Sequence, residues 1–186
     1  MPDTATDADL VRGCQRGHPP SQEALYRRHW SFAMSVCLRY APSRDDALEV
    51  AHDAFVKAFA AIDRVDPDRP FRPWFRRVLV RCAVDRHRST RRHRDLVSAQ
   101  AEPPEAAVPA GALDALGAED LLRLLDALSD DQRAVFNLYE VEGYGHDEIA
   151  GLLGIAPGTS RSHLTRARQR LRALYHERAG REEAAR

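Results

Sequence analysis

The sequence predicts an all-α fold made of two small helical domains joined by a flexible linker, and three observations carry this prediction. Every periodic apolar pattern repeats at about 3.6 residues, and no stretch alternates as a half-buried strand does. Ser, Thr, Gly and Pro stand where helices begin and end. Residues 95–115 contain three prolines, no basic residue and no apolar period, as a flexible acidic linker does. We therefore expect a domain over 1–94, a second over 116–178 and a tail over 179–186.

The helices of the first domain are delimited by their capping residues. Thr6 is expected to cap a short helix that stops at Gly17. Ser21, after two prolines, is expected to cap a second helix that ends near Tyr40, and Ser43 a third.

The third helix has an acidic row opposite its apolar face. Asp45, Glu49 and Asp53 follow one another at four-residue spacing. Like charges at this spacing destabilise an isolated helix by a few tenths of a kcal/mol each. The row therefore favours a basic partner, with an ordinary solvated face as the alternative.

A fourth helix is expected from about Pro73 to Arg92. Arginines recur along one side of it, away from Trp74, and aromatic residues stand at its start. Basic residues beside aromatic rings are typical of proteins that bind single-stranded or melted nucleic acid. A plain core position is the alternative for the rings, and it is the preferred interpretation for Trp74 and Phe75. The preceding loop, 63–71, is made rigid by two prolines and is a candidate pocket for an extruded base.

The second domain contains a helix-turn-helix pattern. Helices are expected near 116–127, 130–142, 146–153 and 157–177. Gly154 suits the left-handed end of one helix and Pro157 the first turn of the next. The final helix buries one seam and leaves its Arg, Ser and Thr residues outside, as a helix in a DNA major groove does. Its seam residues are Ser160, Leu164, Ala167, Leu171 and Leu174.

Charge is segregated although the formal net charge is zero. Residues 72–94 hold nine arginines against one aspartate, 95–131 hold nine acids against one arginine, and 161–178 hold six arginines against one glutamate. Two basic blocks that flank an acidic one suggest two contacts with a polyanion.

Several classes of protein are excluded by what the sequence does not contain. There is no apolar run long enough to span a bilayer, no secretory signal, no phosphate loop and no nucleophile–base pairing. Three scattered cysteines are expected to be small buried residues in a reducing cytoplasm rather than a disulfide or metal framework. We therefore expect no enzyme, no cofactor, no metal and no small-molecule substrate.

Four segments together resemble a bacterial sigma factor of the extracytoplasmic-function (ECF) group of the sigma-70 family. Residues 46–55 resemble region 2.2, which docks on core RNA polymerase, and 71–88 resemble regions 2.3 and 2.4, which melt and read the −10 element. Residues 128–136 resemble region 4.1, and 142–171 resemble region 4.2, which reads the −35 element. The resemblance covers nearly the whole chain.

The resemblance assigns a role to each candidate site residue. The −35 element would be read by His146, Arg161, Ser162, Thr165, Arg166, Arg168 and Arg172. The −10 element would be read by Asp66, Phe71, Trp74, Arg77, Arg81, Asp85 and Arg88. Core polymerase would be bound by Asp45, Asp46, Glu49, His52 and Asp53.

The chain also departs from the family pattern at three positions. Ser160 stands where an aliphatic residue is usual, Arg81 where Asn is common, and His52 where Gln is common. The −10 base preference therefore does not transfer at Arg81.

The resemblance implies a cytoplasmic factor that directs promoter-specific initiation, with core RNA polymerase, promoter DNA and an anti-sigma factor as partners. A stand-alone helix-turn-helix regulator that binds an operator without polymerase is the alternative of a different class. A third alternative is an RNA-processing enzyme, but the sequence contains no constellation of catalytic residues for it.

Overall fold

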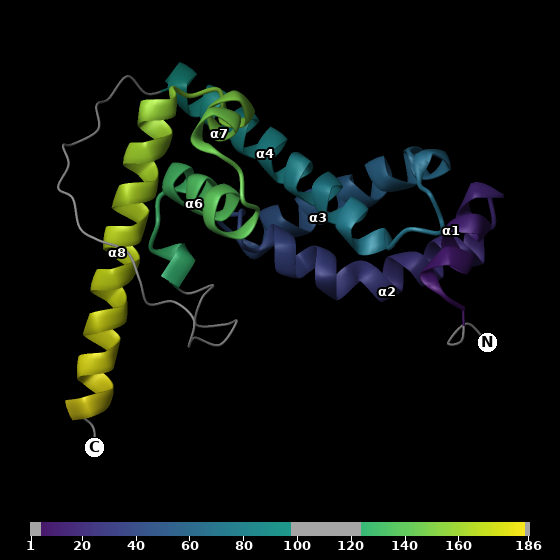
Figure 1. Ribbon diagram of the computed structural model, residues 1–186, viewed down its shortest axis with the longest axis horizontal. Helices are drawn as coiled ribbons and strands as arrows, with labels where there is room; N and C mark the ends of the chain where they lie inside the picture. Colours follow the sequence, from purple (N-terminus) through teal and green to yellow (C-terminus); the bar gives the residue numbers. More distant parts are fainter. Residues whose placement is uncertain (1–4, 98–123, 185–186) are drawn as a thin grey trace. The chain divides into compact units, whose positions relative to one another are not determined.

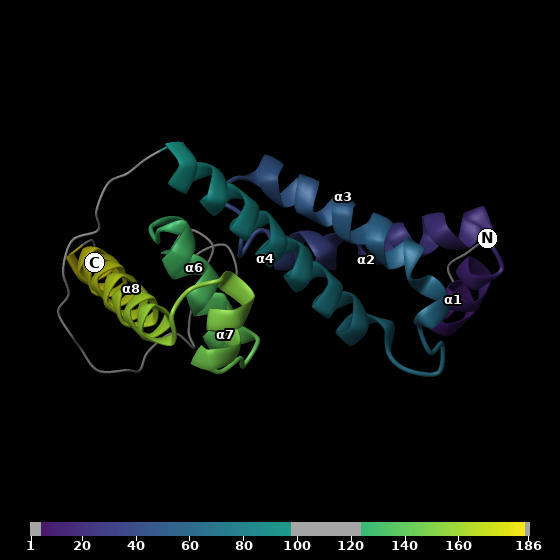
Figure 2. The same cartoon turned by 90° about the horizontal axis from the view of Figure 1, so that it is seen from above.

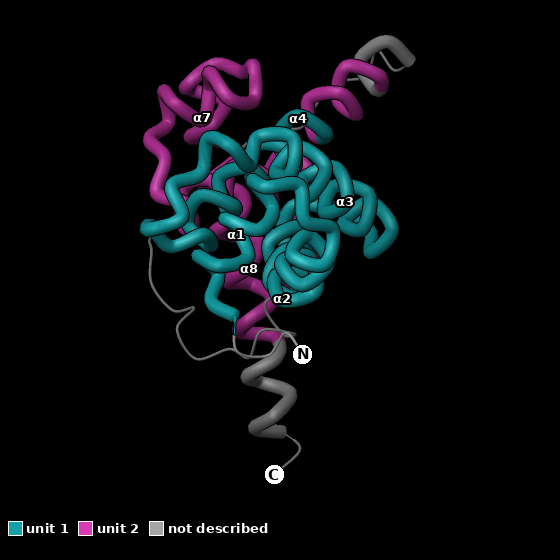
Figure 3. The backbone as a smooth tube through the Cα atoms, turned by 90° about the vertical axis from the view of Figure 1, so that its right-hand side faces the viewer, with its two compact units in different colours: residues 1–86 teal, residues 87–186 magenta. Residues whose placement is uncertain are grey.

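A computed structural model describes residues 5–97 and 124–184, and these residues form helices and connecting turns without any strand (Figure 1). The chain divides into two compact units, residues 1–86 and 87–186 (Figure 3). The all-α prediction is confirmed.

Unit 1 consists of three helices, a short 3-10 helix and the start of a fourth long helix. These are α1 (Asp7–Gln15), α2 (Pro19–Cys37), α3 (Arg44–Ala60), η1 (Ile62–Arg64) and α4 (Phe71–Val97). Figure 2 shows α3 and α4 lying lengthwise beside one another. Since α4 continues beyond residue 86, its last residues belong to unit 2.

Two of the three predicted helix caps in unit 1 are confirmed. The hydroxyl of Thr6 accepts from the backbone N–H of Asp9, and that of Ser43 accepts from the N–H of Asp46. Ser21 as a cap was wrong, because α2 already begins at Pro19 and its N-cap residue is His18, three residues earlier. The two prolines at its start have no N–H to satisfy, so no capping side chain is needed there.

The core of unit 1 is aromatic. Phe75 is fully buried, with its ring centroid 4.7 Å from that of Phe55 and 5.4 Å from that of Phe71. These contacts join α3 to the first turns of α4 and so fix where α4 begins. The expectation for the three cysteines is confirmed in the burial of Cys14, Cys37 and Cys82. Burial raises the pKa of the Cys37 thiol to about 12.

Unit 2 contains the helix-turn-helix. Its elements after the linker are α6 (Asp130–Phe136), the π-helical turn η2 (Asn137–Val141), α7 (His146–Leu153) and α8 (Pro157–Ala184). The single helix expected over 130–142 therefore ends in a wider turn. The N–H of Tyr144 reaches back to the carbonyl of Leu138, and Gly143 has a φ of 79°.

Two predicted boundaries differ from the helices observed. The predicted linker over 95–115 lies outside the described residues except for 95–97, which belong to α4. Helix α8 continues to Ala184, through most of the expected tail 179–186. Alanine, arginine and glutamate, which dominate that stretch, are strong helix formers. The domain limits themselves stay predictions.

Candidate nucleic-acid interface

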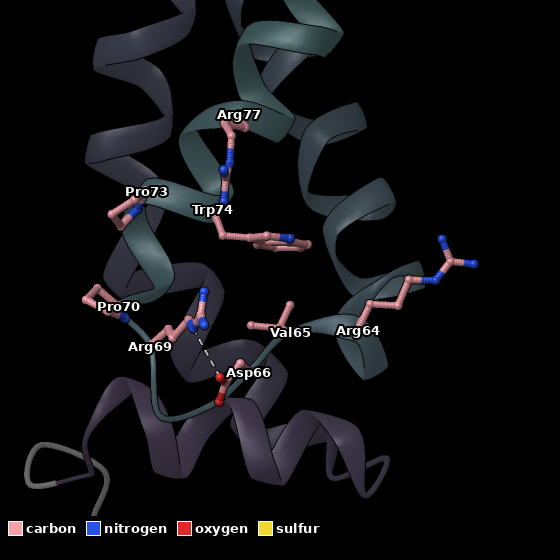
Figure 4. Close-up of a pocket in the computed structure, with 8 residues that line it drawn as sticks. All are labelled: Arg64, Val65, Asp66, Arg69, Pro70, Pro73, Trp74 and Arg77. Carbon is pink, nitrogen blue, oxygen red and sulfur yellow. Dashed lines mark ion pairs between the residues drawn. The ribbon is translucent and has the colours of Figure 1, made fainter.

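A cavity of about 340 Å³ opens where the 64–70 loop meets the first turns of α4 (Figure 4). The indole of Trp74 forms one wall, Val65 lies across from it, and arginines surround the opening. The cavity therefore combines an aromatic face with positive charge.

Hydrogen bonds between side chains and backbone atoms hold the loop in place. Gln15 of α1 donates its side-chain amide to the carbonyls of Ile62 and Val65, at 3.1 and 2.8 Å. The carboxylate of Asp66 accepts from the N–H of Asp68 at 3.0 Å and lies 3.3 Å from Nε of Arg69. These contacts shape the cavity before any ligand arrives.

The predicted −10 residues do not all lie at this cavity. Asp66, Trp74 and Arg77 line it, and Arg81 is exposed one turn further along α4. The prediction that Phe71 contacts the −10 element is corrected, because its ring is only 2% exposed and packs in the core. It lies 5.6 Å from the ring of Trp74 and so supports the wall from behind.

Two predicted −10 residues lie further along α4. Asp85 is exposed and faces Lys57 of α3, with Oδ2 3.6 Å from Nζ. Arg88 lies in unit 2, beyond the division of the chain, and is half-buried. The cavity thus gathers three of the seven predicted residues.

The acidic row of α3 has an internal counter-charge that the sequence analysis did not anticipate. Arg86 of α4 places Nη2 3.1 Å from Oδ1 of Asp46 and 2.8 Å from Oε2 of Glu49. The Ser43 hydroxyl, and then Arg86, hold the pKa of Asp46 below its usual range. Asp45 and Asp53 remain exposed beside this pair.

His52, the fifth predicted polymerase contact, lies on an aromatic surface between α2 and α3. Its ring stacks on Trp30 with centroids 5.2 Å apart, and its Nε2 lies 3.3 Å from the hydroxyl of Tyr26. Val56, one turn along α3, is 68% exposed. The exposure of Val56 could have been predicted from the sequence, because this apolar residue lies on the polar face of its helix.

The helix-turn-helix has the predicted geometry. Gly154 adopts the left-handed conformation at the end of α7, with φ 68°, and α8 begins at Pro157. Ser160 is completely buried in the first turn of α8, where its hydroxyl lies 2.9 Å from Nδ1 of His146. This bond explains how a polar residue occupies a core position.

The predicted −35 residues fall into two groups. Arg161 is exposed, and Ser162, Thr165, Arg166 and Arg172 are partly exposed along α8. The Thr165 hydroxyl donates to the Arg161 carbonyl within the helix.

His146 and Arg168 are engaged within the unit. The His146 ring stacks on Tyr139 at 4.8 Å, and Arg168 pairs with Glu140. Burial, followed by the nearby Arg161 and Arg168, lowers the pKa of His146.

Within the described ranges there is no cluster of His, Cys, Asp or Glu that could hold a metal ion. Nor does any helix in these ranges have the length and apolar character to cross a membrane.

Comparison with protein families matches residues 25–93 to "Sigma-70 region 2" and residues 118–171 to "Sigma-70, region 4". The "ECF RNA polymerase sigma-E factor" of Escherichia coli K12 is 30% identical, over 91% of this chain and 94% of the relative. The chain belongs to the ECF group of sigma-70 family sigma factors. This sigma factor binds core RNA polymerase and promoter DNA and directs transcription initiation.

The chain is also similar to a second relative and to a solved structure. The "ECF RNA polymerase sigma factor SigE" of Mycolicibacterium smegmatis is 30% identical, over 82% of this chain and 61% of the relative. A solved structure of CnrH in complex with the cytosolic domain of CnrY aligns over 92% of this chain and 97% of that one, with 25% identity and a TM-score of 0.49. The family assignment decides against the stand-alone regulator.

Proposed function

We propose that this sigma factor reads its promoter with two surfaces of different kinds. The cavity of unit 1 receives an unstacked base of the −10 element, and the outer face of α8 reads the −35 element as a duplex. The observation that carries the proposal is the pairing of an aromatic-walled cavity with a separate helix-turn-helix in one chain.

The cavity has the chemistry of a base site. Stacking on an aromatic ring is available to every base, and the indole of Trp74 offers such a ring. Arg64, Arg69 and Arg77 are placed to contact phosphates on either side of an extruded nucleotide. Asp66, which is exposed at the same opening, supplies a carboxylate that accepts from an exocyclic amino group.

The start of α8 has the chemistry of a groove reader. Arg161, Ser162, Thr165 and Arg166 lie in its first two to three turns, beyond the turn at Gly154. In a helix-turn-helix these turns face base edges, and arginine is the side chain best suited to guanine. Arg172, further along, is assigned to the phosphate backbone.

The acidic row of α3 is proposed as the core-polymerase contact. Asp45, His52 and Asp53 form an exposed face there together with Glu49, which pairs with Arg86 as Asp46 does.

We further propose that the factor has no chemistry of its own, acts in the cytoplasm beside the polymerase, and is held inactive by an anti-sigma factor. The last point is supported by the family alone.

The test of the −35 assignment is Arg166→Ala, scored by transcription from a promoter library randomised over the −35 element. A bidentate contact between arginine and guanine discriminates by about 1–3 kcal/mol, or roughly 5- to 150-fold. Selectivity should therefore relax at one or two positions, because one base-reading group is removed.

Arg172→Ala is the matched control. It should weaken all promoters alike and lower the salt slope by about one. If Arg166→Ala instead lowers every promoter by the same factor, then Arg166 contacts phosphate rather than a base. If it leaves transcription unchanged, α8 is not the reader.

A further inference from the structure

Glu140 of η2 forms an ion pair with Arg168, which is a predicted DNA contact. Its Oε1 accepts from Nε of Arg168 at 2.7 Å and lies 2.6 Å from Nη2. The Arg168 guanidinium also lies over the ring of Tyr139, 5.5 Å from its centroid. Both members of the pair are 34% exposed, so the pair is accessible to a ligand.

The geometry leaves Arg168 able to bind a second acceptor. A guanidinium has five N–H donors in a planar fork, and Glu140 engages only the edge formed by Nε and Nη2. The opposite edge keeps donors for a phosphate oxygen. The positive charge of Arg168 is nevertheless offset by the carboxylate, so the pair as a whole adds little to the attraction for DNA.

We infer that Glu140 restrains the −35 module by offsetting the positive charge of Arg168, which lowers affinity for duplex DNA of every sequence. The inference rests on the proposed function, in which α8 lies against DNA. Its consequence is that discrimination between promoters depends more on the base-reading residues at the start of α8 and less on charge.

A role in folding alone is the competing explanation. Exposed ion pairs contribute little to stability, and Glu140→Gln keeps the shape of the side chain and an oxygen that accepts from Arg168. This substitution therefore removes the charge and leaves the position of Arg168 supported. Thermal unfolding by circular dichroism should be nearly unchanged in the variant.

The experiment measures holoenzyme binding to two duplex probes at several salt concentrations. One probe is a promoter fragment selected from the randomised library, and the other is the same fragment with its −35 element scrambled. Glu140→Gln should tighten binding to both probes by about fivefold near physiological salt and steepen the salt slope by about one, as one added phosphate contact does.

Two controls make the test specific. Glu177→Gln makes the same change of net charge at an exposed position nine residues beyond Arg168 on α8, and it should leave both affinities nearly unchanged. In an Arg168→Gln background, Glu140→Gln should have no effect, because the carboxylate acts through that arginine.

Three outcomes would overturn the inference. These are no gain in affinity from Glu140→Gln, a loss of affinity, or an equal gain when Arg168 is absent. Failure of the proposed function is recognised separately. In that case Arg166→Ala leaves −35 selectivity unchanged, whatever Glu140→Gln does.

Discussion

The DNA surfaces proposed for the two units differ in shape. Unit 1 offers a hollow, formed by a loop tied to α1 and by the first turns of α4. Unit 2 offers the solvent-exposed side of α8, which follows the turn at Gly154. A hollow with an aromatic wall suits a base that has left the stack, whereas a protruding helix suits the groove of an intact duplex. In the proposed function, this difference assigns melting to unit 1 and duplex recognition to unit 2.

The units also share a feature. Each one neutralises part of its predicted contact set from within: Arg86 pairs with Asp46 and Glu49 in unit 1, and Glu140 pairs with Arg168 in unit 2. Blocks of like charge in the sequence therefore overstate the charge presented to a partner.

Phe75→Ala should destabilise unit 1 strongly and leave unit 2 intact. The side chain is fully buried against Phe55 and Phe71, and truncation of a buried Phe costs about 3–5 kcal/mol. Urea unfolding, followed by NMR signals from each unit, gives the two free energies. Equal losses in both units would mean that they unfold as one body. Trp74→Ala, at the half-buried neighbouring position, is the control and should cost less.

Much of this architecture was predictable, because helix caps are local. Thr6, Ser43 and Gly154 act through residues three or four positions away, which a sequence pattern can capture. The pairing of Arg86 with Asp46 spans 40 residues and that of Arg168 with Glu140 spans 28, and spacing along the chain carries no signal for either.

The sequence left the burial of Phe71 open for a related reason. An aromatic residue at a helix start fits both a core and a base platform, and only its packing on Phe75 decides between them. The cavity was predictable as a rigid loop beside α4. That Trp74 forms its wall and that Arg64 lies at its opening could be seen only in the folded chain.

Trp74→Ala should impair promoter melting more than promoter binding. Loss of one base–aromatic stack costs about 1–3 kcal/mol, or roughly 5- to 150-fold in the stability of the open complex. The measurement is permanganate reactivity of unpaired thymines in the −10 region, with holoenzyme at saturating concentration. Trp74→Phe should retain part of the function, because it keeps a ring. If the alanine variant melts DNA normally, the cavity does not receive a base.

Acid should destabilise unit 1 through His29. Its ring is buried against Phe71, and its Nε2 lies 3.1 Å from Oδ2 of Asp7. Burial lowers the pKa of His29, and this outweighs the opposing effect of Asp7, while Arg72 and Arg28 lower it further.

As the pH falls, His29 is therefore protonated in the unfolded chain before it is protonated in the folded protein. As pH falls below about 6.5, the free energy of unfolding of unit 1 should fall, by at most about 1.4 kcal/mol per pH unit for one proton. Urea unfolding between pH 8 and pH 5 measures the slope. His29→Gln should remove this part of the slope, and an unchanged slope in that variant would assign it to other groups.

The smallest expected effect concerns the bond between Ser160 and His146, which joins the two helices of the helix-turn-helix. Ser160→Ala removes the hydroxyl from a fully buried position, and the net loss of one such hydrogen bond is about 0.5–1.5 kcal/mol. His146→Gln should cost at least as much, because it leaves the buried Ser160 hydroxyl with a weaker hydrogen-bond partner and no access to water. The double variant should cost less than the two single losses added together, since each single change already breaks the bond. Thermal unfolding of the four proteins gives the coupling free energy. Simple additivity would mean that the bond contributes nothing, and that Ser160 is buried for its small volume alone.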